Sequence, residues 1–151
     1  MKRVLIANRG EIAVRIIRCL SQMGIESVSI YSDSDSDSLH RQLADIAVPI
    51  GGQSSAESYL VIEKIIAAAQ KAECDAIHPG YGFLSENAEF SKAVTTAGMI
   101  FIGPKHSSIE KLGDKIAARK LAQDVGATTT SGSKQALQLS LIHISEPTRP
   151  Y

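Results

Sequence analysis

Apolar positions alternate between two patterns along most of this chain. Short continuous apolar runs predict strands buried on both faces, and they lie at residues 3–7, 26–31, 47–50, 74–77 and 99–102. Between them, apolar residues recur at helical spacing, and this pattern predicts helices at residues 10–23, 39–44, 58–72, 86–97, 107–112 and 115–125. Strands that alternate with helices predict an α/β fold with a mainly parallel sheet, helices on both faces and right-handed crossovers.

Capping residues support these helix boundaries. Gly24 is placed to end the first long helix, because a glycine accepts the left-handed conformation that commonly follows a helix. Ser85 is placed to cap the helix at 86–97, where Glu86 and Glu89 favour the positive end of the helix dipole. Gly98 is placed to end that helix.

Composition narrows the class of protein. The chain has 151 residues, of which 44% are hydrophobic, and its 16 basic and 16 acidic residues give zero net charge. This is typical of about one globular domain and gives no sign of a nucleic-acid-binding face. No apolar run approaches the ~18 residues of a membrane span, and no signal peptide is visible, so we expect a cytoplasmic protein without a membrane partner.

The spacing of the cysteines and histidines does not predict a metal site. No CxxC or HxxxH pattern occurs. Cys19 falls in an apolar helix pattern and Cys74 lies just before an apolar strand, so we expect both thiols to be buried and inert.

Two loops that follow predicted strands could carry chemistry. The segment His78–Gly82 has two glycines around a tyrosine, which is typical of a binding loop at the carboxyl end of a parallel strand, although an ordinary Pro/Gly turn fits as well. The segment Asn8–Glu11 lies where dinucleotide-binding folds carry GxGxxG, but Gly10 stands alone there. We therefore favour a structural interpretation, in which Gly10 allows the turn while Arg9 and Glu11 pair with neighbouring elements.

The chain also resembles the biotin carboxylases, the ATP-dependent components of acetyl-CoA, propionyl-CoA, methylcrotonyl-CoA and pyruvate carboxylases. The resemblance covers residues 2–132 and rests on four segments in order: Ile6–Ala13, Ala76–Asn87, Phe101–Pro104 and Gly113–Lys115. It implies a Rossmann-like N-terminal domain that precedes an ATP-grasp domain absent here. The implied ligase reaction consumes ATP and bicarbonate and carboxylates biotin held on a carrier protein, for example in the acetyl-CoA carboxylase of fatty acid biosynthesis.

The resemblance also assigns roles to individual residues. It implies that Lys115 contacts an ATP phosphate, that Tyr81 and Gly82 line the biotin pocket, and that Arg18 lies at a homodimer interface. From the residues alone, Lys115 could equally be a solvated charge at a helix start, and Arg18 part of a solvated helix face. The implied cofactors are ATP, Mg2+ and biotin, with a biotin carboxyl carrier domain and a carboxyltransferase as partners. No catalytic or metal-binding residue is assigned within this chain.

The pattern divides the chain into three parts. We expect the biotin carboxylase N-terminal domain at 1–126, the start of a linker at 127–139, and a tail at 140–151 that is unlike the family and is either artefactual or disordered. The chain alone is expected to be inactive and to bind no cofactor tightly. Urea carboxylase, pyruvate carboxylase and a non-catalytic α/β binding module are the alternatives. Gly113–Lys115 argues against the urea branch and Tyr31–Asp35 favours the acyl-CoA branch, whereas the acyl acceptor is chosen by a separate protein.

Overall fold

The computed structural model describes residues 1–113 and 115–128. Contacts divide the chain into two units, Met1–Glu110 and the part from Lys111 onward. The first unit holds the sheet and the candidate site, and the second holds helix α6 (Lys115–Asp124). The predicted tail at 140–151 lies outside the described residues.

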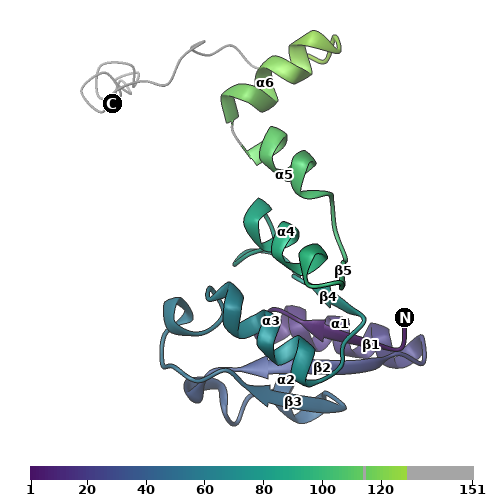
Figure 1. Cartoon of the computed structure of the whole chain (residues 1–151), viewed down its shortest axis with the longest axis vertical. Coiled ribbons are helices and arrows are strands. Elements are labelled where there is room, and N and C mark those ends of the chain that lie inside the picture. The colour runs from purple at the N-terminus through teal and green to yellow at the C-terminus, as the bar shows by residue number, and fades with distance from the viewer. Residues whose placement is uncertain (114, 129–151) are drawn as a thin grey trace, which may run out of the picture. The chain divides into compact units, whose positions relative to one another are not determined.

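A parallel sheet forms the centre of the first unit (Figure 1). Its order is β3-β2-β1-β4-β5, and every neighbouring pair is parallel. The strands are β1 (Arg3–Ile6), β2 (Glu26–Tyr31), β3 (Ile46–Pro49), β4 (Ala76–His78) and β5 (Ile100–Phe101). The predicted α/β fold with its parallel sheet is therefore confirmed.

Helices pack on both faces of this sheet. They are α1 (Gly10–Gln22), α2 (Leu39–Leu43), α3 (Ile62–Lys71) and α4 (Ala88–Thr96), while the short 3-10 turns η1 (Asp33–Asp35) and η2 (Ser55–Glu57) lie between elements. Helix α5 (His106–Gly113) begins in the first unit and ends in the second. Successive residues of a strand point to opposite faces. Accordingly Val4 and Ile6 pack with the apolar stripe of α1, whereas Leu5 packs with residues of α3 and α4. Each face thus has its own core.

Two helix starts differ from the prediction. Helix α3 begins at Ile62 rather than at 58, because Ser54 and Glu57 form a capping box around η2 and Ser58 leaves helical geometry. Helix α4 begins at Ala88, and its cap is Asn87, whose side chain accepts a hydrogen bond from the Phe90 amide at 2.8 Å. The prediction that Ser85 caps this helix was wrong.

The two cysteines differ in exposure. Cys74 is buried, as predicted, and burial raises the pKa of its thiol to about 11. Cys19 is exposed, so the prediction for this residue was wrong. The buried stripe of α1 passes through Ile16, Ile17 and Leu20, and Cys19 lies beside it on the outer face.

Candidate functional site

The strand order reverses between β1 and β4. From β1 the chain moves outward through β2 and β3, and it then returns to β4 and continues to β5 on the other side. Ligands of open α/β sheets bind at such a switch point, outside the carboxyl ends of the strands. The two loops at this place are Ala7–Arg9, after β1, and Pro79–Asn87, after β4, and the Ala7 amide donates to the His78 carbonyl at 2.9 Å.

Asn8 fastens the second loop to the first. Its side chain is only 4% exposed, and Nδ2 donates to the carbonyls of Pro79 at 2.9 Å and Tyr81 at 2.8 Å. Gly80, between those carbonyls, has φ +68°, and a Cβ there would lie 2.8 Å from Nδ2 of Asn8. Glycine is thus required at position 80 both by backbone conformation and by the close approach of Asn8.

Tyr81 stands at the rim of this site. Its side chain is 61% exposed, and its hydroxyl donates a hydrogen bond to the Glu11 carboxylate at the start of α1. That bond raises the pKa of Tyr81. Tyr81 and Gly82 border a hollow of about 390 Å³ together with residues of the β1 loop. The structure therefore brings the two predicted biotin-pocket residues to one hollow, while their role stays a prediction.

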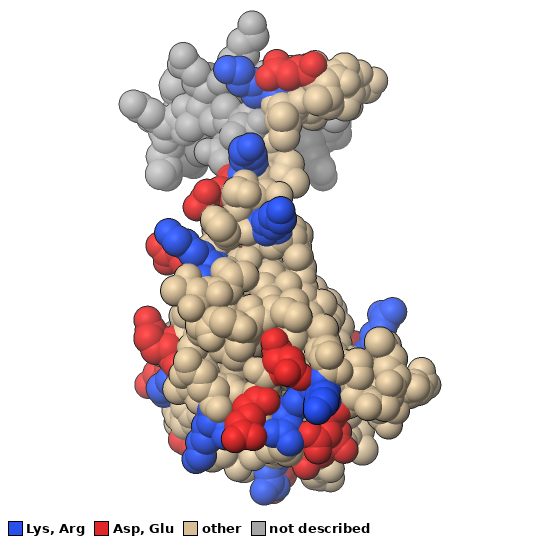
Figure 2. All heavy atoms as spheres, turned by 45° about the vertical axis from the view of Figure 1, so that its right-hand side comes forward, with Lys and Arg blue, Asp and Glu red and all other residues tan. Residues whose placement is uncertain are grey.

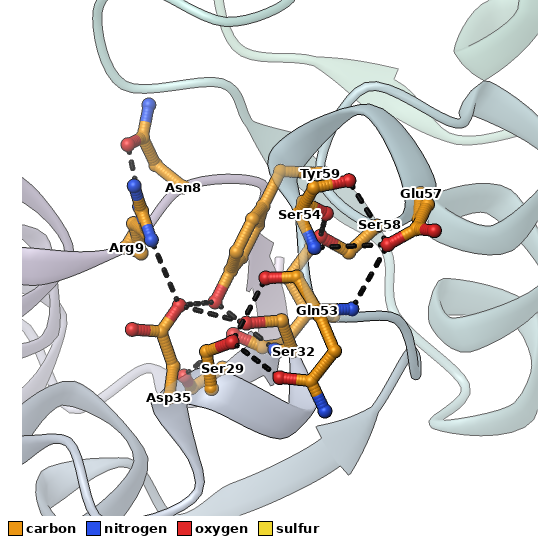
Figure 3. A network of polar contacts seen from close by, with 12 residues as sticks. Asn8, Arg9, Ser29, Ser32, Asp35, Gln53, Ser54, Glu57, Ser58 and Tyr59 are labelled. Atoms are coloured by element: carbon orange, nitrogen blue, oxygen red, sulfur yellow. Dashed lines mark hydrogen bonds and ion pairs between the residues drawn. The ribbon is translucent and has the colours of Figure 1, made fainter.

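Arg9 links three elements around the switch point (Figure 3). Its guanidinium pairs with the Asp35 carboxylate at 3.3 Å, and its central carbon lies 5.6 Å and 5.8 Å from the ring centres of Tyr59 and Phe83. The two rings stack in parallel with centroids 5.4 Å apart. Phe83 itself has φ 43°, a conformation that non-glycine residues seldom adopt. Contacts with the Tyr59 ring and the Arg9 guanidinium hold Phe83 in this conformation.

Asp35 accepts hydrogen bonds from two further side chains. One carboxylate oxygen accepts from Tyr59 Oη at 2.7 Å and from Ser32 Oγ at 3.0 Å, while the Ser32 amide donates to Tyr59 Oη at 3.2 Å. Burial alone would raise the pKa of Asp35, but the bonds from Tyr59, Ser32 and Arg9 hold it below its usual value. Burial and the bond to Asp35 raise the pKa of Tyr59.

These contacts bear on the interpretation of the first loop. Dinucleotide-binding folds keep an acidic residue beyond the second strand for the ribose. Here Asp35 takes that place, yet its carboxylate is occupied by Arg9, Ser32 and Tyr59. Gly10 has φ +64°, as a tight turn requires. The predicted pairing of Arg9 and Glu11 with neighbouring elements is therefore confirmed.

Arg18 lies away from this loop, exposed on α1. It borders a second hollow of about 930 Å³, which His40 also lines. His40 is 1% exposed, and neither of its ring nitrogens has a hydrogen-bond partner among residues 1–113 and 115–128. Burial lowers its pKa, opposed by the Asp35 carboxylate. No local pattern marked His40 as buried, and the interface role of Arg18 stays a prediction.

Lys115 begins α6 in the second unit. The predicted contact of Lys115 with ATP stays a prediction.

Sequence reasoning missed Asn8, Asp35 and Tyr59 as the residues that shape the site. Their side chains act on backbone groups and on one another across many residues of chain, for which no local pattern exists. His78 adds a smaller support, since its Nδ1 accepts a hydrogen bond from the Gly80 amide at 3.0 Å and burial lowers its pKa.

In the face drawn in Figure 2, acidic and basic side chains lie side by side rather than in a patch of one sign. Among the described residues, no group of three or more His, Cys, Asp or Glu could hold a metal ion, and no helix is long and apolar enough to cross a membrane.

Comparison with known proteins adds independent evidence. The family model for the biotin carboxylase N-terminal domain matches residues 1–109. The chain is 54% identical over 136 residues to biotin carboxylase of Halalkalibacterium halodurans, covering 90% of this chain and 30% of that protein. It is also 54% identical over 130 residues to urea amidolyase of Saccharomyces cerevisiae, covering 86% of this chain and 7% of that protein.

A solved structure supports the same relationship. The biotin carboxylase domain of a single-chain bacterial carboxylase superposes with a TM-score of 0.88 at 44% identity, covering 95% of this chain and 33% of that one. The chain therefore spans a third or less of each of these proteins. Because identity is 54% to both curated relatives, overall similarity does not separate the urea branch from the others.

Proposed function

The chain belongs to the family of biotin carboxylase N-terminal domains, and on that premise we propose that residues 1–126 form this domain of an ATP-dependent biotin carboxylase. The enzyme would carboxylate biotin on a carrier domain, with ATP and bicarbonate as co-substrates, and a carboxyltransferase would pass the carboxyl group to an acyl-CoA. The observation that carries this proposal is the loop at the switch point, where Asn8 holds the segment of Tyr81 and Gly82.

The loop has the chemistry of a pocket wall for biotin. Its hollow of about 390 Å³ falls within the ~300–1,000 Å³ usual for small-molecule sites. Tyr81 offers an exposed aromatic face, and Gly82, with φ +65°, leaves the backbone open to close approach. The flat ureido ring of biotin could pack against the Tyr81 ring and approach the Gly82 backbone closely.

Lys115 would contact an ATP phosphate from the start of α6. A unit charge pair at 4 Å is worth about 4 kcal/mol when the effective dielectric is near 20. One lysine therefore cannot hold ATP tightly, and the remaining contacts to ATP and Mg2+ would come from regions outside residues 1–126. We accordingly expect the 151-residue chain to be inactive alone. Arg18 would lie at the homodimer contact of the whole enzyme.

The urea branch is a second candidate. Its support is the 54% identity to urea amidolyase, which equals the identity to a biotin carboxylase. The carboxylation of biotin would be the same in both branches, and only the acceptor served by the carboxyltransferase would differ.

A chimera tests the proposal. Residues 1–128 replace the matched segment of the Halalkalibacterium biotin carboxylase, and ATP hydrolysis is measured with and without bicarbonate and biotin. We expect hydrolysis that requires both. A folded chimera without bicarbonate-dependent hydrolysis would contradict the proposal. Within the active chimera, Lys115→Gln should raise the KM for ATP about tenfold, as expected for the loss of one charged hydrogen bond, and leave the KM for biotin unchanged.

A further inference from the structure

The loop after β4 depends on the loop after β1 for its position. Three side chains of the β1 side reach it: Asn8 bonds to its backbone, Arg9 lies over the ring of Phe83, and Glu11 accepts from the Tyr81 hydroxyl. Of these contacts, only those of Asn8 are directed to backbone carbonyls. Asn8 is also the buried member of the three.

Both donor hydrogens of the Asn8 carboxamide are used, and its oxygen also accepts a bond. Oδ1 accepts from the Arg9 amide at 2.9 Å, and the two Nδ2 hydrogens serve the carbonyls of Pro79 and Tyr81. No other residue of this size offers one acceptor and two donors. The two carbonyls flank Gly80, so Asn8 fixes the chain on each side of a residue with positive φ.

Tyr81 is held at both ends as a consequence. Asn8 fixes its carbonyl and Glu11 fixes its hydroxyl. Gly82 follows directly on the fixed carbonyl, so its position also depends on Asn8.

We propose that Asn8 is a positioning residue for biotin, acting through Tyr81 and Gly82. This inference rests on the proposed function, in which those two residues line the biotin pocket. Removal of the two donors frees the loop and displaces the pocket wall. A displacement of about 1 Å can lower the rate of a positioned reaction by as much as about 10²-fold.

Two substitutions of Asn8 distinguish the effect of its two donor hydrogens from the effect of the whole side chain. Asn8→Ala removes the carboxamide, while Asn8→Asp keeps the shape and the acceptor for the Arg9 amide but loses both donors. Asp75→Ala is the matched control. Asp75 accepts from the amides of Lys2 at 2.5 Å and Arg3 at 2.9 Å, and so joins β1 to β4 at the opposite, N-terminal end of the same strand pair.

The first measurement uses the 151-residue chain and needs no activity. Amide hydrogen exchange over residues 79–86 should quicken in both Asn8 variants and stay as in the unsubstituted chain in Asp75→Ala. Equal exchange in all variants would show that Asn8 does not hold the loop, and would overturn the inference whatever the function.

The second measurement uses the chimera. In both Asn8 variants kcat/KM for biotin should fall about 10- to 100-fold, while the KM for ATP and the bicarbonate dependence stay unchanged. An unsubstituted chimera without activity would count against the proposed function alone. An active chimera in which Asn8→Asp keeps its biotin kinetics, or Asp75→Ala loses them equally, would overturn the inference.

Discussion

The hydroxyl of Tyr59 offers a sharp test of the polar network beside the site. Tyr59 is 1% exposed, and its hydroxyl donates to Asp35 at 2.7 Å and accepts from the Ser32 amide at 3.2 Å. Tyr59→Phe removes one oxygen and keeps the ring that stacks on Phe83. The substitution leaves the buried Ser32 amide without this acceptor and takes one donor from the Asp35 carboxylate.

The expected cost follows from these two losses. An unsatisfied buried amide costs about 1–3 kcal/mol, and a hydrogen bond to a charged group contributes about 1.5–3 kcal/mol. Because the Asp35 side chain is 19% exposed, water can replace part of the second contribution. We therefore expect Tyr59→Phe to lower the free energy of unfolding by about 3 kcal/mol, a large part of the ~5–15 kcal/mol typical of a domain.

Acid sensitivity should change in a defined direction. The folded pKa of Asp35 lies below its unfolded value of 3.8. Its stabilisation is therefore complete above that value and is lost as the pH falls through the folded pKa. Without the Tyr59 donor the folded pKa moves toward the unfolded value, so the variant should lose less stability on acidification than the unsubstituted chain.

Urea denaturation followed by far-UV circular dichroism measures these free energies. A double-mutant cycle with Asp35→Asn should give a coupling energy of about 1–2 kcal/mol, as expected for residues in one network. Tyr31→Phe is the control, since no hydrogen bond of its hydroxyl is seen among the described residues, and it should cost less than about 0.5 kcal/mol. A similarly small cost for Tyr59→Phe, or a coupling energy near zero, would show that the Tyr59 hydroxyl does not stabilise this network.

Three further predictions concern the glycine turn, a buried histidine and the two thiols. Gly80→Ala should lower the free energy of unfolding, measured by urea denaturation, more than Gly98→Ala does. Both glycines have positive φ, but of the two only position 80 would bring a Cβ against a neighbour, at 2.8 Å. Equal losses for the two variants would contradict this. Burial lowers the pKa of His40 in the folded chain below the unfolded value near 6.5. Through His40, the free energy of unfolding therefore does not change with pH above that value, and it declines as the pH falls below it, because the unfolded chain binds the proton first. His40→Leu should flatten the stability curve below that pH, and an unchanged curve would count against the assignment. Iodoacetamide should modify exposed Cys19 well before Cys74, whose pKa is raised to about 11, as mass spectrometry of timed samples would show; faster modification of Cys74 would be inconsistent with its burial.

The sheet was predictable because its signals are local. Each apolar run and each helical stripe lies within one element, so their alternation was enough to predict a parallel α/β fold. The residue that caps α4 was not predictable, because both Ser85 and Asn87 suit a helix start. Only the observed backbone places Asn87 where its side chain reaches the Phe90 amide. Cys19 was misplaced because it borders the buried stripe of α1 closely in sequence.

The candidate site was predictable in part. The glycines marked the loop after β4, and the lone Gly10 indicated the tight turn that its φ of +64° forms. The links among Arg9, Asp35 and Tyr59 join residues more than twenty positions apart, so they depend on the fold. The hydrogen bonds from Asn8 end on backbone carbonyls. Every residue has such a carbonyl, so the sequence does not indicate which ones Asn8 contacts.

The proposed function requires that this domain support the carboxylation of biotin. The most direct test supplies radiolabelled bicarbonate, ATP and free biotin to the chimera and measures label in carboxybiotin, with the host enzyme lacking its N-terminal segment as the control. Our account predicts ATP-dependent labelling by the chimera and none by the control. A folded chimera that hydrolyses ATP but never labels biotin would contradict it.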